Sequence, residues 1–182
     1  MPNSVAAGKP WVFRADAITR DAAIDQALLA RGFHIVTPPL TAQSGAVRTQ
    51  WNNAYALMTE HGFSKKPVME GTGTAAGESY AWAIENPDKV VCIVGRNPAL
   101  RSLMSKTWPL ENLEPLAKGG VPLLHVCDRT DPWFNDQTKV VEERYKGLGG
   151  DITVIINEND ARSPLAPAAQ TRAVDFILGK TK

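Results

Sequence analysis

The residues best suited to chemistry follow one short apolar run, Pro67–Glu70. The sequence continues as Gly71-Thr-Gly-Thr-Ala-Ala76, a turn of small residues that leads into a helical stretch. Glycines at this spacing match a G-x-G-x-x-A fingerprint, in which backbone amides at a helix N-terminus hold the pyrophosphate of a dinucleotide. Arg96, at the end of the next apolar run, could then face a 2′-phosphate. In nucleotide-binding sheets this fingerprint usually follows the first strand, whereas here two strand and helix units precede it, so a simple anion site is another interpretation.

Hydroxyl groups in and after the turn could act as nucleophiles. Thr72 and Thr74 lie within it, but the motif places no general base beside them. Gly77-Glu-Ser-Tyr-Ala81 matches G-x-S-x-A, which makes Ser79 a further candidate. Small turn residues rather than a strand precede Ser79, so we expect it to be an ordinary helix residue. A hydrolase that uses one of these three hydroxyls stays an alternative.

Alternating elements along the chain would position this turn. Short apolar runs predict strands, and most are continuous in apolarity, as in strands covered by helices on both faces. The predicted strands are Trp11–Ala15, Phe33–Thr37, Pro67–Glu70, Val90–Gly95, Leu123–Cys127 and Ile152–Ile156. The pattern predicts a single α/β domain over residues 1–182, built on a doubly wound, mostly parallel six-stranded sheet with helices on both faces. Ligands of such sheets bind at the carboxyl ends of the strands.

Apolar residues at helical spacing fill the segments between the strands, and glycines follow them as terminators. The stripes are Ile24–Arg31 before Gly32, Val47–Met58 before Gly62, Val141–Leu148 before Gly149, and Ala173–Leu178 before Gly179. Ser44 can cap the second of these helices. We interpret the apolar faces as core.

The strand, turn and helix of Pro67–Val90 resemble the nucleophile elbow of the α/β-hydrolase superfamily, most closely its esterase-like and dienelactone-hydrolase-like members. The likeness rests on Tyr80-Ala-Trp-Ala in the helix and on Asn86-Pro-Asp-Lys-Val after it. In that family the elbow reads G-x-S-x-G. The corresponding residues here are Gly71-Thr-Gly-Thr-Ala75, so Gly73 stands at the position of the serine.

The resemblance extends over nearly the whole chain. Trp11–Ala15 resembles the strand whose following loop gives one oxyanion-hole amide. The strand that starts at Leu123 resembles the one before the catalytic acid, with Asp131 as the matching carboxylate. The segment from Ile152 resembles the last strand and the loop that brings in the histidine, and Arg162 is nearest to that position. The resemblance also implies a chain that is short for the superfamily and lacks its first strands.

Two members of the expected Ser-His-Asp triad are therefore replaced, at Gly73 and Arg162, and only Asp131 is retained. Ester hydrolysis needs the serine oxygen as nucleophile and the imidazole to take its proton. A guanidinium stays protonated at physiological pH and cannot be that base. We therefore expect a pseudoenzyme that binds a small molecule or a partner protein through the vestigial pocket. The alternatives are an esterase with a non-standard nucleophile, and a nucleotide- or phosphate-binding module at Gly71–Ala76.

The resemblance gathers a set of residues around this pocket. They are Arg14, Ala15, Gly71, Thr72, Thr74, Asp131 and Trp133. Arg14 and Arg162 would make the pocket cationic, which suggests a carboxylate or phosphate as ligand. Trp133 and Phe134 could stack on a sugar or an aryl group, although we expect them to pack under the next helix.

Composition limits the partners. The chain has 182 residues and a formal net charge of +1, so bulk electrostatics favours neither nucleic acid nor an anionic membrane. No apolar stretch approaches the roughly 18 residues that span a bilayer. The first residues lack the pattern of a secretory signal, so a cytoplasmic protein and an exported one without its leader are both compatible. An uncovered sheet edge would favour pairing, which keeps a homo-oligomer open.

We predict neither a cofactor nor a metal site. His34, His61 and His125 have no second ligand at metal spacing. His34 and His125 lie within predicted strands, as core residues would, and His61 lies at a helix end, where a cation is favourable. Cys92 and Cys127 lack C-x-x-C spacing and are expected to be buried free thiols.

Overall fold

The fold is built on a parallel sheet that has strands in the order β2-β1-β3-β4-β5-β6. The computed structural model describes residues 1–17, 22–37, 44–101, 108–159 and 164–181, with the backbone alone for 44–47. The strands are β1 (Trp11–Arg14), β2 (His34–Val36), β3 (Val68–Thr72), β4 (Cys92–Arg96), β5 (Leu123–Asp128) and β6 (Ile152–Asn157). Every neighbouring pair is parallel, so the predicted sheet is confirmed and is fully parallel.

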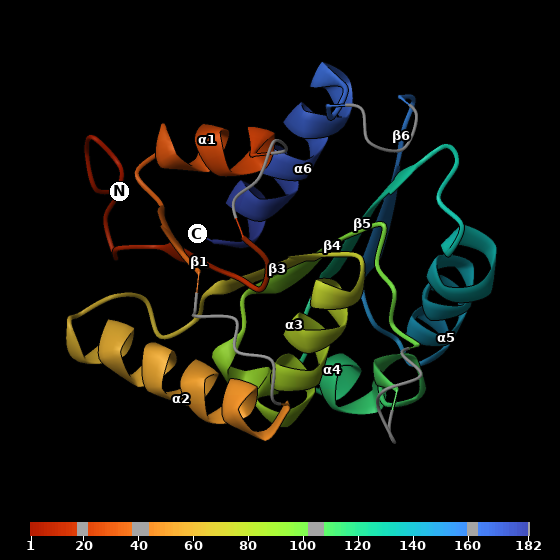
Figure 1. The fold of residues 1–182 in the computed structure, drawn as a ribbon, viewed down its shortest axis with the longest axis horizontal. Coiled ribbons are helices and arrows are strands. Elements are labelled where there is room, and N and C mark those ends of the chain that lie inside the picture. The colour runs from red at the N-terminus through yellow and green to blue at the C-terminus, as the bar shows by residue number, and fades with distance from the viewer. Residues whose placement is uncertain (18–21, 38–43, 102–107, 160–163, 182) are drawn as a thin grey trace.

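Helices cover both faces of the sheet, as the continuous apolar strands predict. They are α1 (Ala23–Leu29), α2 (Ser44–Glu60), α3 (Thr74–Glu85), α4 (Glu114–Lys118), α5 (Lys139–Gly147) and α6 (Pro167–Lys180). Single short turns of other helix types are η1 (Pro87–Lys89), η2 (Pro109–Glu111) and η3 (Phe134–Thr138). In Figure 1, α1 and α6 lie above the sheet, and α2, α3 and α4 lie below it, with α5 beside the far strands.

Two apolar layers follow from the alternation of side chains along each strand. Phe13 and Met69 face the α2, α3 and α4 side, where Trp51 and Trp82 join them in an aromatic cluster. Val12 and its neighbours on the other strands face α1 and α6. The described apolar side chains of the predicted helix faces pack into the core, except Leu148, and α6 continues through Gly179 to Lys180. The side chain of Val47 lies outside the described part of the chain.

Several smaller expectations are also resolved. Leu148 is 47% exposed and lies just beyond α5, so the third stripe ends earlier than its spacing suggests. Cys92 and Cys127 are buried free cysteines, as predicted. Within the described residues, none of the helices combines the length and the apolarity needed to cross a bilayer. The side chain of Ser44, a predicted cap, lies outside the described part of the chain.

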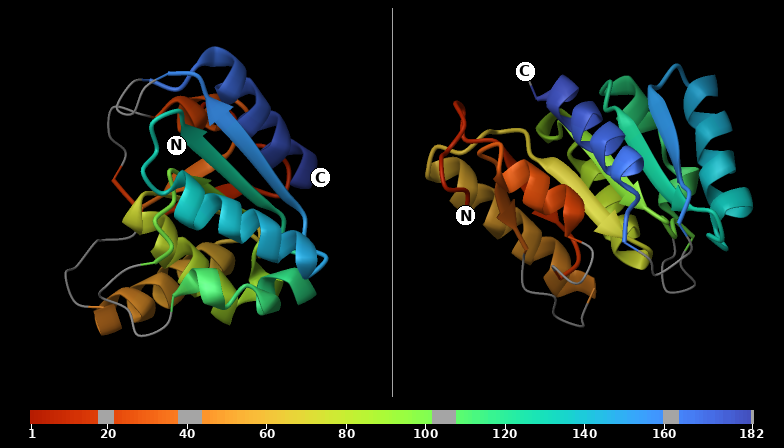
Figure 2. Two further views of the ribbon diagram at one scale, coloured as in Figure 1. Left: turned by 90° about the vertical axis from the view of Figure 1, so that its right-hand side faces the viewer. Right: turned by 90° about the horizontal axis from the view of Figure 1, so that it is seen from above.

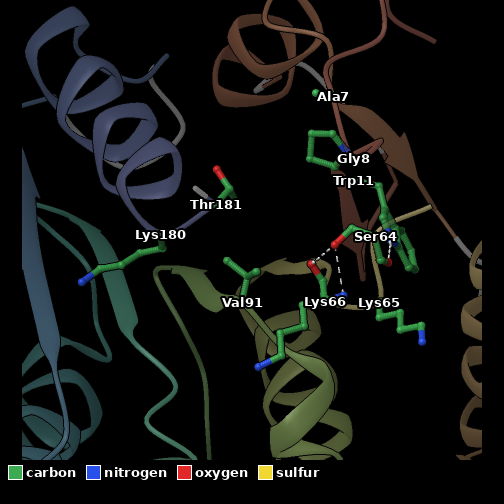
Figure 3. A pocket seen from close by; sticks show the side chains of 10 residues that line it. Ala7, Gly8, Trp11, Ser64, Lys65, Lys66, Val91, Lys180 and Thr181 are labelled. Atoms are coloured by element: carbon green, nitrogen blue, oxygen red, sulfur yellow. Dashed lines mark hydrogen bonds between the residues drawn. The ribbon is translucent and has the colours of Figure 1, made fainter. Parts of the chain in front are cut away.

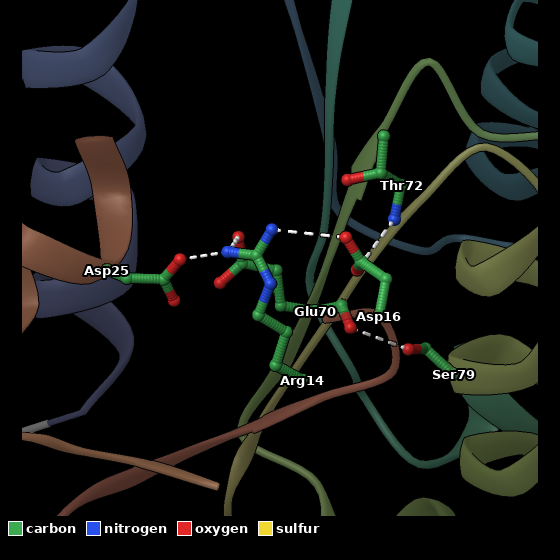
Figure 4. A network of polar contacts seen from close by, with 6 residues as sticks. All are labelled: Arg14, Asp16, Asp25, Glu70, Thr72 and Ser79. Carbon is green, nitrogen blue, oxygen red and sulfur yellow. Dashed lines mark hydrogen bonds and ion pairs between the residues drawn. The ribbon is translucent and has the colours of Figure 1, made fainter. Parts of the chain in front are cut away.

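A buried cluster of charges ties β1, β3 and α1 together (Figure 4). Arg14, which is 2% exposed, donates to Asp25 of α1, to Asp16 at 3.1 Å and to Glu70 at 3.5 Å. Arg14 and Glu70 are direct neighbours in the β1–β3 register. One guanidinium therefore serves three carboxylates. Our expectation that Arg14 lends a free cation to the pocket is wrong, because its charge is neutralised inside the fold.

Burial is the main influence on the protonation of Glu70. Burial raises its pKa to about 7 against the opposing pull of Arg14. Its Oε2 atom has no hydrogen-bond partner among the described residues. The folded state therefore binds the proton of Glu70 more tightly than the unfolded chain does. Such a group stabilises the fold below its unfolded pKa, and this contribution is lost as the pH rises through about 7.

Replacing Glu70 with Gln should remove this pH dependence, because the amide mimics the protonated acid. We expect Glu70→Gln to gain about 2–3 kcal/mol in unfolding free energy relative to the wild type between pH 5 and pH 8. Urea unfolding of both proteins at the two pH values measures the difference. Glu78→Gln, at an exposed site of α3, is the control and should show no such change. An equal difference at both pH values would mean that Glu70 is ionised throughout.

Candidate functional site

The turn between β3 and α3 holds the residue that the sequence places at the position of a nucleophile. Gly73 has φ 55° and ψ −125°, a conformation that residues with a side chain rarely adopt. Its N–H donates to the Arg96 carbonyl at 2.9 Å, and its own carbonyl accepts from the Ala99 N–H at 3.0 Å. A Cβ added to Gly73 would meet no atom of the described residues within 4 Å. A side chain at this position would therefore project from the turn into open space.

Gly71 sets the distance between strand and helix. A Cβ on Gly71 would lie 2.6 Å from the backbone nitrogen of Ala76, which is closer than atoms tolerate. The first turn of α3 therefore sits directly against the end of β3. This is the close strand-to-helix turn that the small residues of the sequence predict.

The candidate hydroxyls differ in their exposure. Ser79 is fully buried in α3, and its hydroxyl donates to the Glu70 carbonyl at 3.0 Å, so it packs against β3 as an ordinary helix residue. Thr72 and Thr74 are exposed at the turn. Within the described part of the chain, neither threonine hydroxyl is hydrogen-bonded to a histidine or a carboxylate. They are available to a ligand, but they lack an activating base.

An acidic side chain sits against the turn from the loop after β1. Asp16 accepts a hydrogen bond from the Thr72 N–H at 3.2 Å and pairs with Arg14 (Figure 4). The N–H of Ala15, a predicted pocket residue, donates to the Glu70 carbonyl at 2.8 Å, so it is committed to the sheet. A carboxylate beside the turn repels a phosphate or an oxyanion. The Asp16 carboxylate therefore opposes the binding of an anionic ligand at the turn.

The retained acid lies after β5. Asp131 is 8% exposed, and its Oδ1 accepts from the Trp133 N–H at 2.9 Å. Its Oδ2 is buried without a hydrogen-bond partner among the described residues. Burial raises the pKa of this carboxyl, although the Trp133 hydrogen bond opposes the shift. The Asp131 carboxylate is therefore held inside the fold, with its Oδ2 enclosed.

The two aromatic residues after Asp131 have different surroundings. Trp133 is 43% exposed, so our expectation that it packs under the next helix is wrong. Phe134 is half-buried, with the Lys139 ammonium 5.3 Å from its ring centre. An exposed indole beside an acid can stack on a flat apolar face of a ligand.

A buried polar cluster that the sequence did not reveal fixes the ends of β4, β5 and β6. The Asp128 carboxylate accepts from Asn97 and Asn157, both at 2.6 Å, and lies 3.7 Å from the Arg96 guanidinium. The side-chain oxygen of Asn97 in turn accepts a hydrogen bond from the Asp128 N–H at 2.8 Å. The signal in the sequence that could have indicated this cluster is the polar residues at the ends of the apolar runs. Because Arg96 is directed to Asp128, the structure gives no support to its predicted role toward a 2′-phosphate.

The histidines serve the fold. His125 is fully buried, with ring nitrogens 2.7 Å from the Tyr80 hydroxyl and 3.1 Å from that of Thr138. Burial lowers the pKa of His125 to about 3, so the ring stays neutral. His34 is buried on β2, and the Nδ1 of His61 lies 2.9 Å from the Leu57 carbonyl at the end of α2. Both core predictions are confirmed. Arg162, at the expected histidine position, lies outside the described residues.

A cavity lies at the amino-terminal edge of the sheet, opposite the edge that carries the Gly73 turn (Figure 3). It has a volume of about 340 Å³ and is lined by Trp11, Val91 and the lysines 65, 66 and 180 among others. Lys180 pairs with Asp151 at 2.8 Å, and the side chain of Lys65 points away from the cavity in Figure 3. This cavity is separate from the Gly73 turn. Among the described residues no cluster of three or more histidine, cysteine or acidic side chains could hold a metal ion.

Comparison with known proteins identifies the fold. No protein-family model matches the chain, and no curated protein matches it in sequence. Solved structures do match over nearly its whole length. A Klebsiella pneumoniae protein assigned to the dienelactone hydrolases superposes with a TM-score of 0.73 at 14% identity, covering 98% of this chain and 89% of that one.

Lipases and esterases match as well. A monoacylglycerol lipase from Paleococcus ferrophilus has a TM-score of 0.65 at 12% identity, covering 98% of this chain and 97% of its own. A carboxylesterase structure from the thaumarchaeon Nitrososphaera gargenis has a TM-score of 0.60 at 14% identity, with 96% and 90% covered. Identities this low establish the architecture alone. The chain therefore has an α/β-hydrolase-like fold, as its sequence resemblance predicts.

Proposed function

We propose that this chain is a pseudoenzyme, a binding protein that keeps the α/β-hydrolase-like fold without ester hydrolysis. The observation that carries the proposal is the turn at Gly73, whose backbone projects position 73 into open space while the residue has no side chain. A nucleophile at the expected position is therefore missing. Arg162, at the expected position of the histidine, could not take its proton either.

The charge of Asp16 beside the turn is a second obstacle to ester hydrolysis. An oxyanion hole needs N–H donors that point at a developing negative charge. In the α/β-hydrolase elbow these donors are the N–H of the residue after the nucleophile, here Thr74, and one from the loop after β1, where Asp16 lies beside the turn. The Asp16 charge would raise the energy of an oxyanion formed nearby. The electrostatics therefore support binding rather than acyl transfer.

The ligand that suits the described residues is neutral and donates hydrogen bonds. The exposed Thr72 and Thr74 hydroxyls can donate and accept hydrogen bonds. Trp133 offers an exposed indole for stacking. A sugar or an aryl alcohol has this combination of hydroxyl groups and a flat apolar face. The carboxylate or phosphate ligand loses the part of its basis that rests on Arg14, since Arg14 is buried among acids.

A serine-hydrolase probe tests the loss of nucleophilic chemistry. We expect a fluorophosphonate to leave the folded wild-type chain unlabelled in intact mass spectrometry and peptide mapping, beside a serine esterase as positive control. Labelling of Thr72, Thr74 or Ser79 in the folded sample, but not in a heat-denatured one, would show that catalysis uses a new nucleophile. That outcome would replace the pseudoenzyme by an esterase.

A thermal-shift assay tests the nucleotide interpretation of the same turn. We expect NADPH and inorganic phosphate each to leave the melting temperature unchanged, because Asp16 and not a cation contacts the turn. Asp16→Asn is the informative variant, because it removes the repelling charge. Stabilisation of the wild type by NADPH but not by phosphate would support a dinucleotide site at Gly71–Ala76.

The two turn glycines should respond differently to a methyl group. Gly71→Ala should lower the unfolding free energy by about 3 kcal/mol or more, since its Cβ would strike the α3 backbone. Gly73→Ala should cost about 1–3 kcal/mol, because it meets only backbone strain. Urea unfolding compares both variants with Gly147→Ala, whose Cβ has open space and an ordinary helical backbone. Equal losses at positions 71 and 73 would contradict the elbow geometry.

A further inference from the structure

The strand β6 forms one edge of the sheet and pairs only with β5. In the left panel of Figure 2, β6 faces the viewer with α6 on one side and α5 on the other, and neither crosses it. Its sequence, Ile-Thr-Val-Ile-Ile-Asn, contains no charged residue and no proline. Edge strands of monomeric proteins are usually protected by such residues or by a covering element. The described residues give this edge none of those protections.

The hydrogen-bond register shows which backbone groups are directed outward. The Leu123 N–H donates to the Asp151 carbonyl at 2.8 Å, and Leu123 is in register with Ile152. Backbone groups of successive strand residues point to alternate sides, so residues 151, 153, 155 and 157 face β5. The N–H and carbonyl groups of Ile152, Val154 and Ile156 therefore point to the open edge. A paired strand is the structural partner that satisfies such a row.

The side chains of the same three residues share one face of the sheet. Ile152 is buried in the core cluster on the α5 side, and Val154 packs against that cluster. Ile156 follows by alternation and is 38% exposed, which leaves an apolar surface at the carboxyl end of the strand.

We infer that β6 pairs with β6 of a second copy of this chain, antiparallel, about a two-fold axis at Val154. This register places Ile156 of each copy opposite Ile152 of the other, and Val154 opposite itself. All the outward N–H and carbonyl groups of Ile152, Val154 and Ile156 are then paired. With the axis at another residue, some of these N–H and carbonyl groups would have no partner in the second copy. The two-fold symmetry also makes the edge complementary to itself.

Charges at the two ends of the strand fit the same register. Asp151 and Lys180 pair near the start of β6, and Arg129 and Glu158 pair near its end. Antiparallel pairing brings the first pair of one copy beside the second pair of the other. At each end of the paired strands, one acidic and one basic side chain of one copy then lie beside one acidic and one basic side chain of the other. Side chains of like charge therefore need not face each other.

Sedimentation equilibrium of the full chain, over a range of protein concentrations, tests the pairing. We expect a reversible monomer–dimer equilibrium, and Val154→Pro should raise the dissociation constant about tenfold or more. Proline at 154 removes a donor from the outer edge only, so the β5–β6 ladder keeps its bonds. Ile156→Lys, at an exposed site, should have the same effect without any risk to the core. Leu57→Lys, at an apolar site 56% exposed on α2, is the matched control and should leave the equilibrium unchanged.

A cysteine at the symmetry axis tests the register. Opposite residues of a hydrogen-bonded antiparallel pair have Cα atoms about 5.5 Å apart, which suits a disulfide. Val154→Cys should therefore give a disulfide-linked dimer under mild oxidation, whereas Leu57→Cys should not. The native Cys92 and Cys127 are buried, and burial raises both of their pKa values, that of Cys127 to about 12, so they should not interfere.

Two results would count against this pairing. A monomer at every concentration, or a dimer that neither β6 variant weakens, would overturn the inference. A β6-dependent dimer in which the Val154→Cys variant fails to cross-link would overturn the register.

Discussion

The close contact between the end of β3 and the first turn of α3 is the constraint on which the rest of the site depends. Gly71 allows that contact, because any Cβ there would strike the helix backbone. The chain must then reverse within one residue, and Gly73 adopts the positive φ that this requires. The bonds from Gly73 to Arg96 and Ala99 hold the neighbouring strand end in place. The turn therefore positions the neighbouring segments at the carboxyl edge of the sheet.

Buried carboxylates stabilise the rest of that edge. Asp128 accepts hydrogen bonds from Asn97 and Asn157, and Asp16 accepts one from the turn itself. These acids use N–H donors that could otherwise point at a ligand. A site that stabilises negative charge needs the reverse arrangement, with free donors and few acids. The same interactions that fix the loops therefore make the edge a poor host for an oxyanion.

The sequence predicts the architecture well because apolar runs and helical stripes are local signals. It misplaces the carboxyl ends of several strands. β3 continues to Thr72, β4 to Arg96 and β5 to Asp128, since a strand that ends at a functional edge carries polar residues there. The turn glycines are found from their spacing, and the close contact of β3 with α3 explains them. The role of Asp131 rests on the family resemblance alone. The ion cluster of Arg14 cannot be found in this way, because residues distant in sequence, in α1 and β3, decide whether its charge is free.

Gly73 and Asp131 have opposite effects on the stability of the fold, the first through backbone strain and the second through burial. A glycine at position 73 adopts the turn conformation without the cost of about 1–3 kcal/mol that a side chain would add. A residue with a side chain at this position would therefore lower the stability of the fold. Asp131 is different, because its Oδ2 is buried without a hydrogen-bond partner among the described residues, which costs about 1–3 kcal/mol. Stability alone gives no reason for that arrangement. Because the atom is enclosed, a ligand could offset this cost only by displacing the residues that cover it.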